Sequence, residues 1–322
     1  MSSFHEAIEE FPICQWAQET LSNVRVGSTE ITADCPFCYG YQKLYLNIEK
    51  KVTNCFRCEA HGVRKGGASL FGFIAELFGS KKAAYSTIKS RVGLPDFHPE
   101  PSARLPKASL IPEGVISLKQ LPDTEPAIQY LKKRHAAQLV PYSYLCLTGQ
   151  FRGRVILPCL YDGVLVGSEC KSLYKSVKPK SLYHPKDIFK TSQTVYTNLN
   201  WNPKSKVAVI TESILDAETF DGIENSLGIY GCVLKPEQVD AILALGVEKL
   251  IWALDGDAFK KIITSIPKLT LDVFENWVTN LGKKEDPNSI GPQGCKELVA
   301  GAVRINGEWD LYDCACKWDK WF

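Results

Sequence analysis

The chain has 322 residues, of which 45% are hydrophobic, and this is enough for two domains with apolar cores. Its 38 basic and 36 acidic residues leave a formal charge of +2, so any site for a polyanion must come from local clustering. No apolar stretch reaches the length of a membrane span, and the acidic N-terminus is unlike a signal peptide. We therefore expect a cytoplasmic protein with no membrane partner.

Two pairs of cysteines follow an N-terminal segment of helical composition. Cys35 and Cys38 form the first pair, and Cys55 and Cys58 form the second. Cysteines separated by two residues fit a tight turn whose amides point at the sulfurs, and two such turns complete a tetrahedral Zn²⁺ shell. The alternating residues 43–54 predict a hairpin that joins the pairs. We expect one structural Zn²⁺ per chain, with His61 as an alternative ligand.

The predicted ribbon interleaves aromatic and basic side chains, namely Phe37, Tyr39, Tyr41, Lys43, Tyr45, Phe56 and Arg57. Such a surface suits single-stranded bases that stack on rings while their phosphates are held alongside, although these rings could equally form the ribbon's small core. A helix is expected from Ser69 to Phe78. Five prolines between Gly93 and Gly114 then predict an extended linker, which would make the ribbon a separate, tethered domain.

A helix over residues 125–139 and a hairpin over residues 151–171, with its turn at Asp162, lead into a cluster of basic residues. The lysines of this cluster are Lys171, Lys175, Lys178, Lys180, Lys186 and Lys190. Asp187 is the single acid among them, and phosphates are their natural partners. The alternative is a solvated surface loop.

Two short apolar runs are each followed directly by acidic residues. Residues 207–211 precede Glu212, and residues 250–254 precede Asp255 and Asp257. Both runs predict buried parallel strands of an α/β sheet, whose ligands bind beyond the carboxyl ends of the strands. A helix over residues 213–220 would carry Asp216 on the same face one turn later. Carboxylates gathered in this way repel one another unless divalent cations separate them, so we expect a site for Mg²⁺ or Mn²⁺.

Three acidic motifs resemble those of the TOPRIM domain of DnaG-type and bacteriophage primases. They are ESILD at 212–216, LDGD at 254–257 and KEDPN at 284–288. The segments RGRVILP, GSECKSLY and PKSLYHPKDIFK resemble the basic catalytic subdomain of the same family. The resemblance implies catalytic roles for Glu212, Asp216, Asp255, Asp257 and Asp286, with the metal on Glu212, Asp255 and Asp257. It implies that Arg154, Lys171, Lys180 and Lys190 bind template and nucleotide, and the charge pattern adds Lys178.

The expected architecture is α/β, or α+β for the chain as a whole. It comprises a zinc-ribbon domain at 1–92, a linker at 93–113, a basic subdomain at 114–200, a doubly wound TOPRIM sheet at 201–291, and a tail at 292–322 without an assigned role. A second helix is expected at 258–269 and a strand at 271–278. The sequence has no phosphate-binding GxxxxGK[ST] motif, so we expect no fused helicase and predict a helicase partner in trans.

The predicted function is DNA primase, which makes short RNA primers from NTPs on a single-stranded DNA template. A phage-encoded primase would act in the host cytoplasm. Ser213, Asn288 and the Phe259-Lys260 pair depart from the family pattern, and they leave the number of catalytic metals open. Two alternatives remain. One is a metal-dependent nuclease that uses the same carboxylates, and the other is a non-catalytic DNA-binding recombination protein, in which substitutions in the metal site would leave DNA binding intact.

Overall fold

The structure is a computed structural model, and it describes residues 4–60, 68–94, 110–174, 176–259, 266, 270 and 273–318. The chain divides into two compact units, Met1–Phe97 and His98–Phe322. Most of the predicted linker, most of the predicted helix at 258–269, and the residues His61 and Lys175 lie outside the described residues. Within the described residues, no helix has the length and apolar character needed to cross a bilayer.

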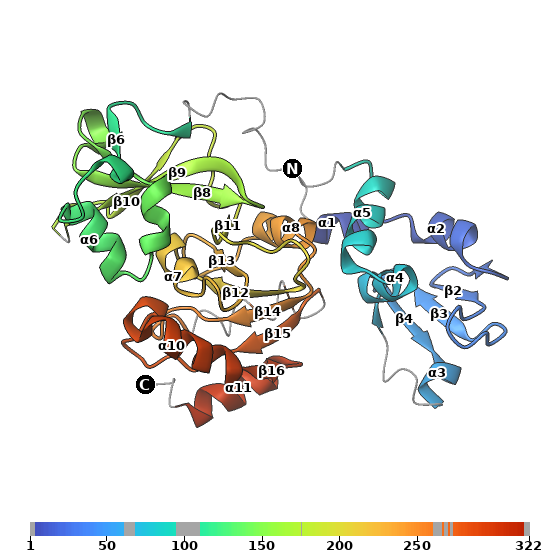
Figure 1. Cartoon of the computed structure of the whole chain (residues 1–322). Helices are drawn as coiled ribbons and strands as arrows, with labels where there is room; N and C mark the ends of the chain where they lie inside the picture. The colour runs from blue at the N-terminus through green and yellow to red at the C-terminus, as the bar shows by residue number, and fades with distance from the viewer. Residues whose placement is uncertain are drawn as a thin grey trace. The chain divides into compact units, whose positions relative to one another are not determined.

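The first unit is a small antiparallel sheet packed with helices (Figure 1). Its strands, in spatial order, are β1 (Arg25–Val26), β2 (Glu30–Ala33), β3 (Leu44–Asn47), β4 (Val52–Cys55) and β5 (Ala68–Ser69). Its helices are α1 (Phe4–Glu10), α2 (Ile13–Thr20), α3 (Phe56–Ala60), α4 (Leu70–Phe78) and α5 (Lys81–Arg91). Pro12 separates α1 from α2, and the Ser69 hydroxyl caps α4 by accepting from the Gly72 amide. Buried aromatic rings, among them Trp16, Phe71 and Tyr85, form the core.

The second unit begins with an antiparallel sheet in the order β10-β9-β8-β7-β6. The strands are β6 (Val115–Ser117), β7 (Tyr144–Cys146), β8 (Arg154–Tyr161), β9 (Val164–Ser172) and β10 (Ser181–His184), with short 3₁₀ turns η2 (Leu118–Gln120), η3 (Ala137–Tyr142) and η4 (Gly149–Phe151). The predicted hairpin at 151–171 is β8–β9. The helix predicted at 125–139 is shorter, because α6 (Pro126–Lys133) ends before His135, whose positive φ of 51° cannot continue a right-handed helix.

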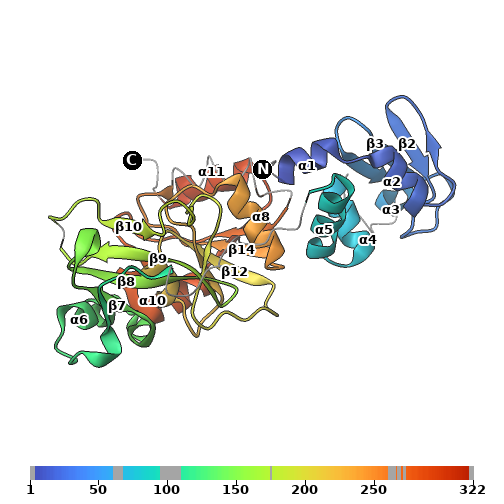
Figure 2. The same ribbon diagram turned by 90° about the horizontal axis from the view of Figure 1, so that it is seen from above.

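A six-stranded sheet completes the second unit, and its four central strands are parallel. The order is β11 (Tyr196–Thr197), β13 (Ser226–Gly228), β12 (Val207–Thr211), β14 (Lys249–Trp252), β15 (Glu275–Val278) and β16 (Val303–Ile305), with both edge strands antiparallel. The helices are α7 (Ile214–Thr219), α8 (Pro236–Ala244), α10 (Pro287–Ala300) and α11 (Glu308–Lys317). Figure 2 shows α8 and α10 on opposite faces, so the expected doubly wound α/β arrangement is confirmed.

The parallel centre of the sheet is built on β12 and β14, which carry apolar side chains on both faces. Val209 and Ile251 pack with Phe220, Ala253 and Cys295 in one buried cluster, under the helices α7 and α10. Complete burial of a side chain of this size stabilises the fold by about 1.5–3 kcal/mol. The predicted strand at 271–278 begins only at residue 275. Residues 292–322, which the sequence left without a role, provide the rest of α10, the edge strand β16 and α11.

Candidate metal and nucleotidyl-transfer site

The four paired cysteines form one tight group. Their sulfurs all lie within 4.8 Å of one another, with Cys35 Sγ 3.6 Å from Cys58 Sγ and Cys38 Sγ 3.7 Å from Cys55 Sγ. Four sulfurs placed tetrahedrally about Zn²⁺ at about 2.3 Å would be roughly 3.8 Å apart. Burial raises the pKa of Cys35, so this thiol would keep its proton unless a cation displaced it. The cluster therefore fits a structural Zn²⁺.

Around this cluster, the aromatic residues divide into core and surface. Phe37 packs edge-on against Phe73 at 5.7 Å, and Tyr45 packs against Phe56 at 5.2 Å between ring centroids. Tyr39 and Tyr41 are exposed by 86% and 63%. Half-buried Phe37 therefore packs against Phe73 of the core, while Tyr39 and Tyr41 stand on the surface of the first unit, where a partner could reach them.

The acidic motifs lie at the carboxyl ends of β12 and β14, as predicted. Residue 210 is in register with residue 252, so Glu212 and Asp255 leave the sheet at the same edge. Gly256 fixes the turn between Asp255 and Asp257. Its amide donates to Glu285 O at 2.9 Å, and a Cβ at this position would lie 1.8 Å from the carbonyl oxygen of Gly282. Only glycine allows this approach, which brings the third acidic motif against the second.

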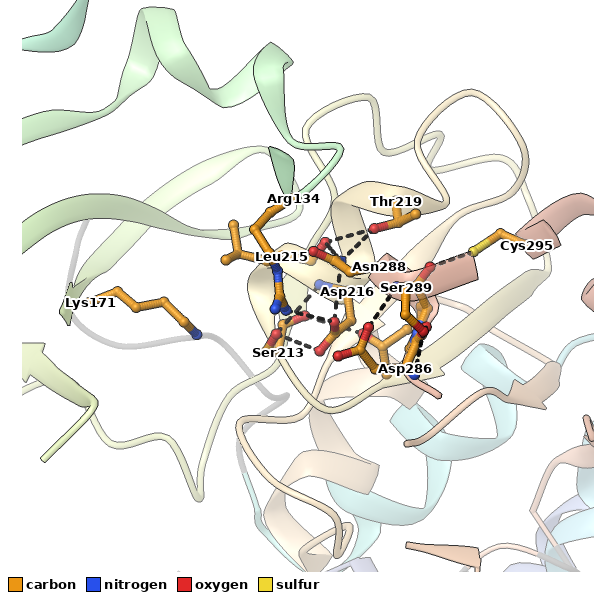
Figure 3. Close-up of polar contacts among 12 residues, drawn as sticks. Arg134, Lys171, Ser213, Leu215, Asp216, Thr219, Asp286, Asn288, Ser289 and Cys295 are labelled. Atoms are coloured by element: carbon orange, nitrogen blue, oxygen red, sulfur yellow. Dashed lines mark hydrogen bonds and ion pairs between the residues drawn. The ribbon is translucent and has the colours of Figure 1, made fainter. Parts of the chain in front are cut away.

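Asp216 lies in the first turn of α7, buried and surrounded by donors (Figure 3). The Ser213 hydroxyl donates to its Oδ2 at 2.6 Å, and Asn288 Nδ2 donates to its Oδ1 at 3.2 Å. Arg134 Nη2 lies 3.5 Å from the same Oδ1. Burial raises the pKa of Asp216, although Ser213, Arg134 and Lys171 all act to lower it. Asp216 thus connects α7, α10 and the residue that follows α6.

Asp255 provides the test of whether a cation fits this site. Burial raises its pKa to about 7, and the nearby carboxylates Asp216, Glu212, Asp286 and Asp257 add to this shift. Its Oδ1 is buried and has no hydrogen-bond partner among the described residues. A buried carboxylate oxygen without a donor, among other carboxylates, is the environment that a hard divalent cation stabilises. Glu212, Asp255 and Asp257 are therefore suitable ligands for Mg²⁺ or Mn²⁺.

The remaining acids are placed more openly. Asp257 is exposed, and Asp286 caps the N-terminus of α10, where its Oδ1 accepts from the Ser289 amide at 2.7 Å. Within the part of the chain that the structure describes, the four cysteines are the only group of three or more His, Cys, Asp or Glu side chains placed to hold a metal ion. A bound cation would therefore have to draw Glu212, Asp255 and Asp257 closer together.

The five predicted basic residues fall into two groups. Arg154 and Lys171 are buried in the antiparallel sheet. Arg154 donates to the carbonyl oxygens of Cys170, Pro179 and Lys180 at 2.8–3.1 Å, and Lys171 Nζ lies 3.0 Å from Glu169 Oε1. Lys178, Lys180 and Lys190 are exposed. Arg154 thus holds the segment that carries Lys178 and Lys180, and Figure 3 shows Lys171 extending toward Arg134 and Asp216.

Arg134 and Glu169 have no role in the sequence-based prediction, and Asn288 enters it only as a departure from a family pattern. All three are paired with residues of the predicted site: Arg134 and Asn288 with Asp216, and Glu169 with Lys171. Arg134 and Asn288 contact residues more than 70 positions away in the chain, so no local pattern could reveal them. Glu169 stands two residues before Lys171 on one strand, where the period of two places them on the same face.

Comparison with known proteins places this arrangement in a known fold. No protein-family model matches the chain, and no curated protein matches it. A solved DnaG primase catalytic domain bound to ssDNA is 18% identical, with 62% of this chain and 78% of that chain covered and a TM-score of 0.50. The zinc-binding and RNA polymerase domains of the Aquifex aeolicus primase are 18% identical, with 98% and 89% covered and a TM-score of 0.45.

The primase fragment of the bacteriophage T7 primase-helicase is 13% identical, with 84% of this chain and 97% of that chain covered and a TM-score of 0.34. The fold assignment rests on the ssDNA-bound catalytic domain, which the sequence motifs had pointed to independently. The resemblance expected from the sequence is confirmed at the level of the fold. The chain has the mixed α/β fold of the DnaG primase catalytic domain, and a four-cysteine cluster that fits zinc precedes it.

Proposed function

We propose that this chain is a DNA primase, which joins ribonucleotides on a single-stranded DNA template. The observation that carries the proposal is the edge where Glu212 and Asp255 leave neighbouring parallel strands, within reach of Asp216 and the Arg134 guanidinium. Phosphoryl transfer needs positioning and positive charge where negative charge develops. A divalent cation held by Glu212, Asp255 and Asp257 would supply that charge and lower the pKa of the attacking 3′-hydroxyl.

The chain's own side chains would handle the nucleic acid and the nucleotide. Exposed Lys178, Lys180 and Lys190 would bind phosphates of the template and the incoming NTP, and Arg154 orders the segment from which Lys178 and Lys180 project. Exposed Tyr39 and Tyr41 on the zinc unit would stack on template bases. The similar catalytic domain that was solved with ssDNA supports a DNA template as the partner.

A double-label assay tests this proposal against its alternatives. The zinc-loaded chain is incubated with Mg²⁺, NTPs labelled at the α-phosphate, and a random pool of 5′-fluorescent single-stranded DNA. Short labelled RNA with intact DNA would support the primase. Shortened DNA without RNA would identify a nuclease, and retention of intact DNA without product would identify a binding protein. The helicase partner is tested by adding a replicative helicase, and a rate that no helicase changes would reject that partner.

The matched variants in this assay are Asp255→Asn and Asp187→Asn. Asp255 follows β14 and lies among other carboxylates, whereas Asp187 is an exposed acid between Lys186 and Lys190. The proposal predicts that Asp255→Asn lowers the rate of RNA labelling by about 10² to 10³ and that Asp187→Asn retains it.

A further inference from the structure

Asn288 lies in the first turn of α10, two residues after the capping Asp286, and is 5% exposed. Its side-chain Nδ2 faces three acceptors on α7. They are Leu215 O at 2.9 Å, Asp216 Oδ1 at 3.2 Å and Thr219 Oγ1 at 2.6 Å. The amide therefore ties the start of α10 to the first turns of α7 (Figure 3).

The surroundings determine which end of the amide faces α7. The Thr219 hydroxyl already donates to Leu215 O at 3.1 Å, so its oxygen is left to accept. A reversed amide would place a carbonyl oxygen against the Leu215 carbonyl and the Asp216 carboxylate, and these groups repel one another. Only the NH₂ group offers donors on this side, and its two N–H groups are shared among the three acceptors. A carboxylate at position 288 would satisfy none of the three acceptors.

This bond also determines where the third acidic motif lies. Asp286 and Ser289 hold the first turn of α10 through reciprocal hydrogen bonds, with Ser289 N to Asp286 Oδ1 at 2.7 Å and Asp286 N to Ser289 Oγ at 3.0 Å. The preceding residue, Glu285, accepts from the amide of Gly256 in the Asp255 turn. The Asn288 amide is the side-chain link that joins this rigid first turn to α7.

We infer that Asn288 is a positioning residue, whose amide donates to Asp216 and fixes Asp286 beside the Asp255 turn. Its importance for catalysis rests on the proposed nucleotidyl transfer, but the link itself does not. Position 288 thus acts as a hydrogen-bond donor, a role that an ionised carboxylate there could not take.

The experiment compares three variants of the full zinc-loaded chain. Asn288→Ala removes the link, Asn288→Asp places a second carboxylate against Asp216, and Asn276→Ala serves as the control. Asn276 is equally buried and donates to Thr270 O and Phe274 O at 3.0 and 2.9 Å. We expect Asn288→Ala and Asn276→Ala to lower Tm by about 5 °C each, and Asn288→Asp to lower it further. In nucleotide incorporation, both substitutions at 288 should reduce kcat about tenfold or more with KM unchanged, while Asn276→Ala keeps kcat.

A charge swap makes the test independent of activity. The double variant Asp216→Asn with Asn288→Asp restores one amide and one carboxylate at these two positions, so it should recover part of the Tm lost by Asn288→Asp alone. The inference is wrong if Asn288→Asp is as stable as the wild type, if the swap recovers nothing, or if Asn276→Ala reduces kcat equally. A wild type that makes no RNA would reject the proposed function, whereas the Tm comparison would still decide the role of Asn288.

Discussion

The guanidinium of Arg134 lies 3.5 Å from the carboxylate of Asp216, and the pair joins two subdomains of the second unit. Arg134 follows α6 beside the antiparallel sheet, and Asp216 opens α7 behind the parallel strand β12. Gln138 adds a second link by donating to Glu218 O at 2.8 Å. The basic and acidic halves of the proposed site are therefore held together by named polar contacts.

Loss of the Arg134 guanidinium should destabilise the second unit. Asp216 is 4% exposed, so Arg134→Ala removes a charged partner from a buried carboxylate, at a cost of about 1–3 kcal/mol in the free energy of unfolding. Urea unfolding followed by tryptophan fluorescence measures the loss. Arg152→Ala, at an exposed arginine in the same subdomain, is the control and should change the midpoint little. Equal midpoints for both variants would show that the pair contributes nothing.

Removal of zinc should unfold the first unit. Without the ion, four thiols whose sulfurs lie within 4.8 Å of one another lose the bonds that hold the two turns together. Cys55→Ser should reduce bound zinc from one ion per chain to nearly none and abolish the thermal transition of this unit. Cys14→Ser, at a half-buried cysteine outside the cluster, should retain both. Metal analysis and calorimetry of the two variants check this, and full zinc content in Cys55→Ser would contradict it.

Glu218 should make the protein less stable as the pH rises. Burial raises its pKa to about 7 from an ordinary value of 4.5, despite hydrogen bonds from Tyr196 and Leu199. Between these two values the folded state holds a proton that the unfolded state has lost, so the free energy of unfolding falls as pH increases from about 4.5 to 7. Glu218→Gln should flatten this slope, and Glu297→Gln, on the exposed side of α10, should leave it unchanged. Urea midpoints at several pH values decide the matter, and parallel slopes for all three proteins would contradict the assignment.

The exposed lysines should contribute to DNA affinity through phosphate contacts. Lys180→Ala should weaken binding of single-stranded DNA and reduce the salt dependence of log K by about 0.7, the value for one phosphate contact. Fluorescence anisotropy over a range of salt concentrations measures this slope. Lys119→Ala is the control, because Lys119 is an exposed lysine outside the basic cluster at residues 171–190. A slope that does not change in Lys180→Ala would remove this residue from the interface.

The sequence predicted those parts of the structure that depend on local chemistry. Residues 207–211 form β12, as expected. A short, largely apolar run between polar residues is typical of a buried strand and is too short for a typical helix. The two-residue spacing within each cysteine pair likewise predicted that the four sulfurs would lie close together. The C-terminal end of α6 was not predicted correctly. The helix stops before His135 because this residue has a positive φ, which amino-acid composition does not reveal.

Long-range polar contacts could not be predicted in this way. The partners of Arg134 and Asn288 lie in distant segments, and a single polar residue carries no periodic signal. The edge strand β16 has only three residues, and it is stabilised by antiparallel pairing with β15 and not by a local sequence pattern. One available signal was missed: Asp286 followed by Pro287 is a typical N-cap and first helical residue, and it marks the start of α10.

The central claim is that the carboxylates at the ends of β12 and β14 catalyse nucleotidyl transfer. The most direct test measures ribonucleotide incorporation on single-stranded DNA by the wild type and by Asp255→Asn, at equal concentrations of folded, zinc-loaded protein in Mg²⁺. The account predicts template-dependent RNA from the wild type and a rate lower by about 10² to 10³ in the variant. Equal incorporation by the two proteins, or none by the wild type on any template, would contradict it.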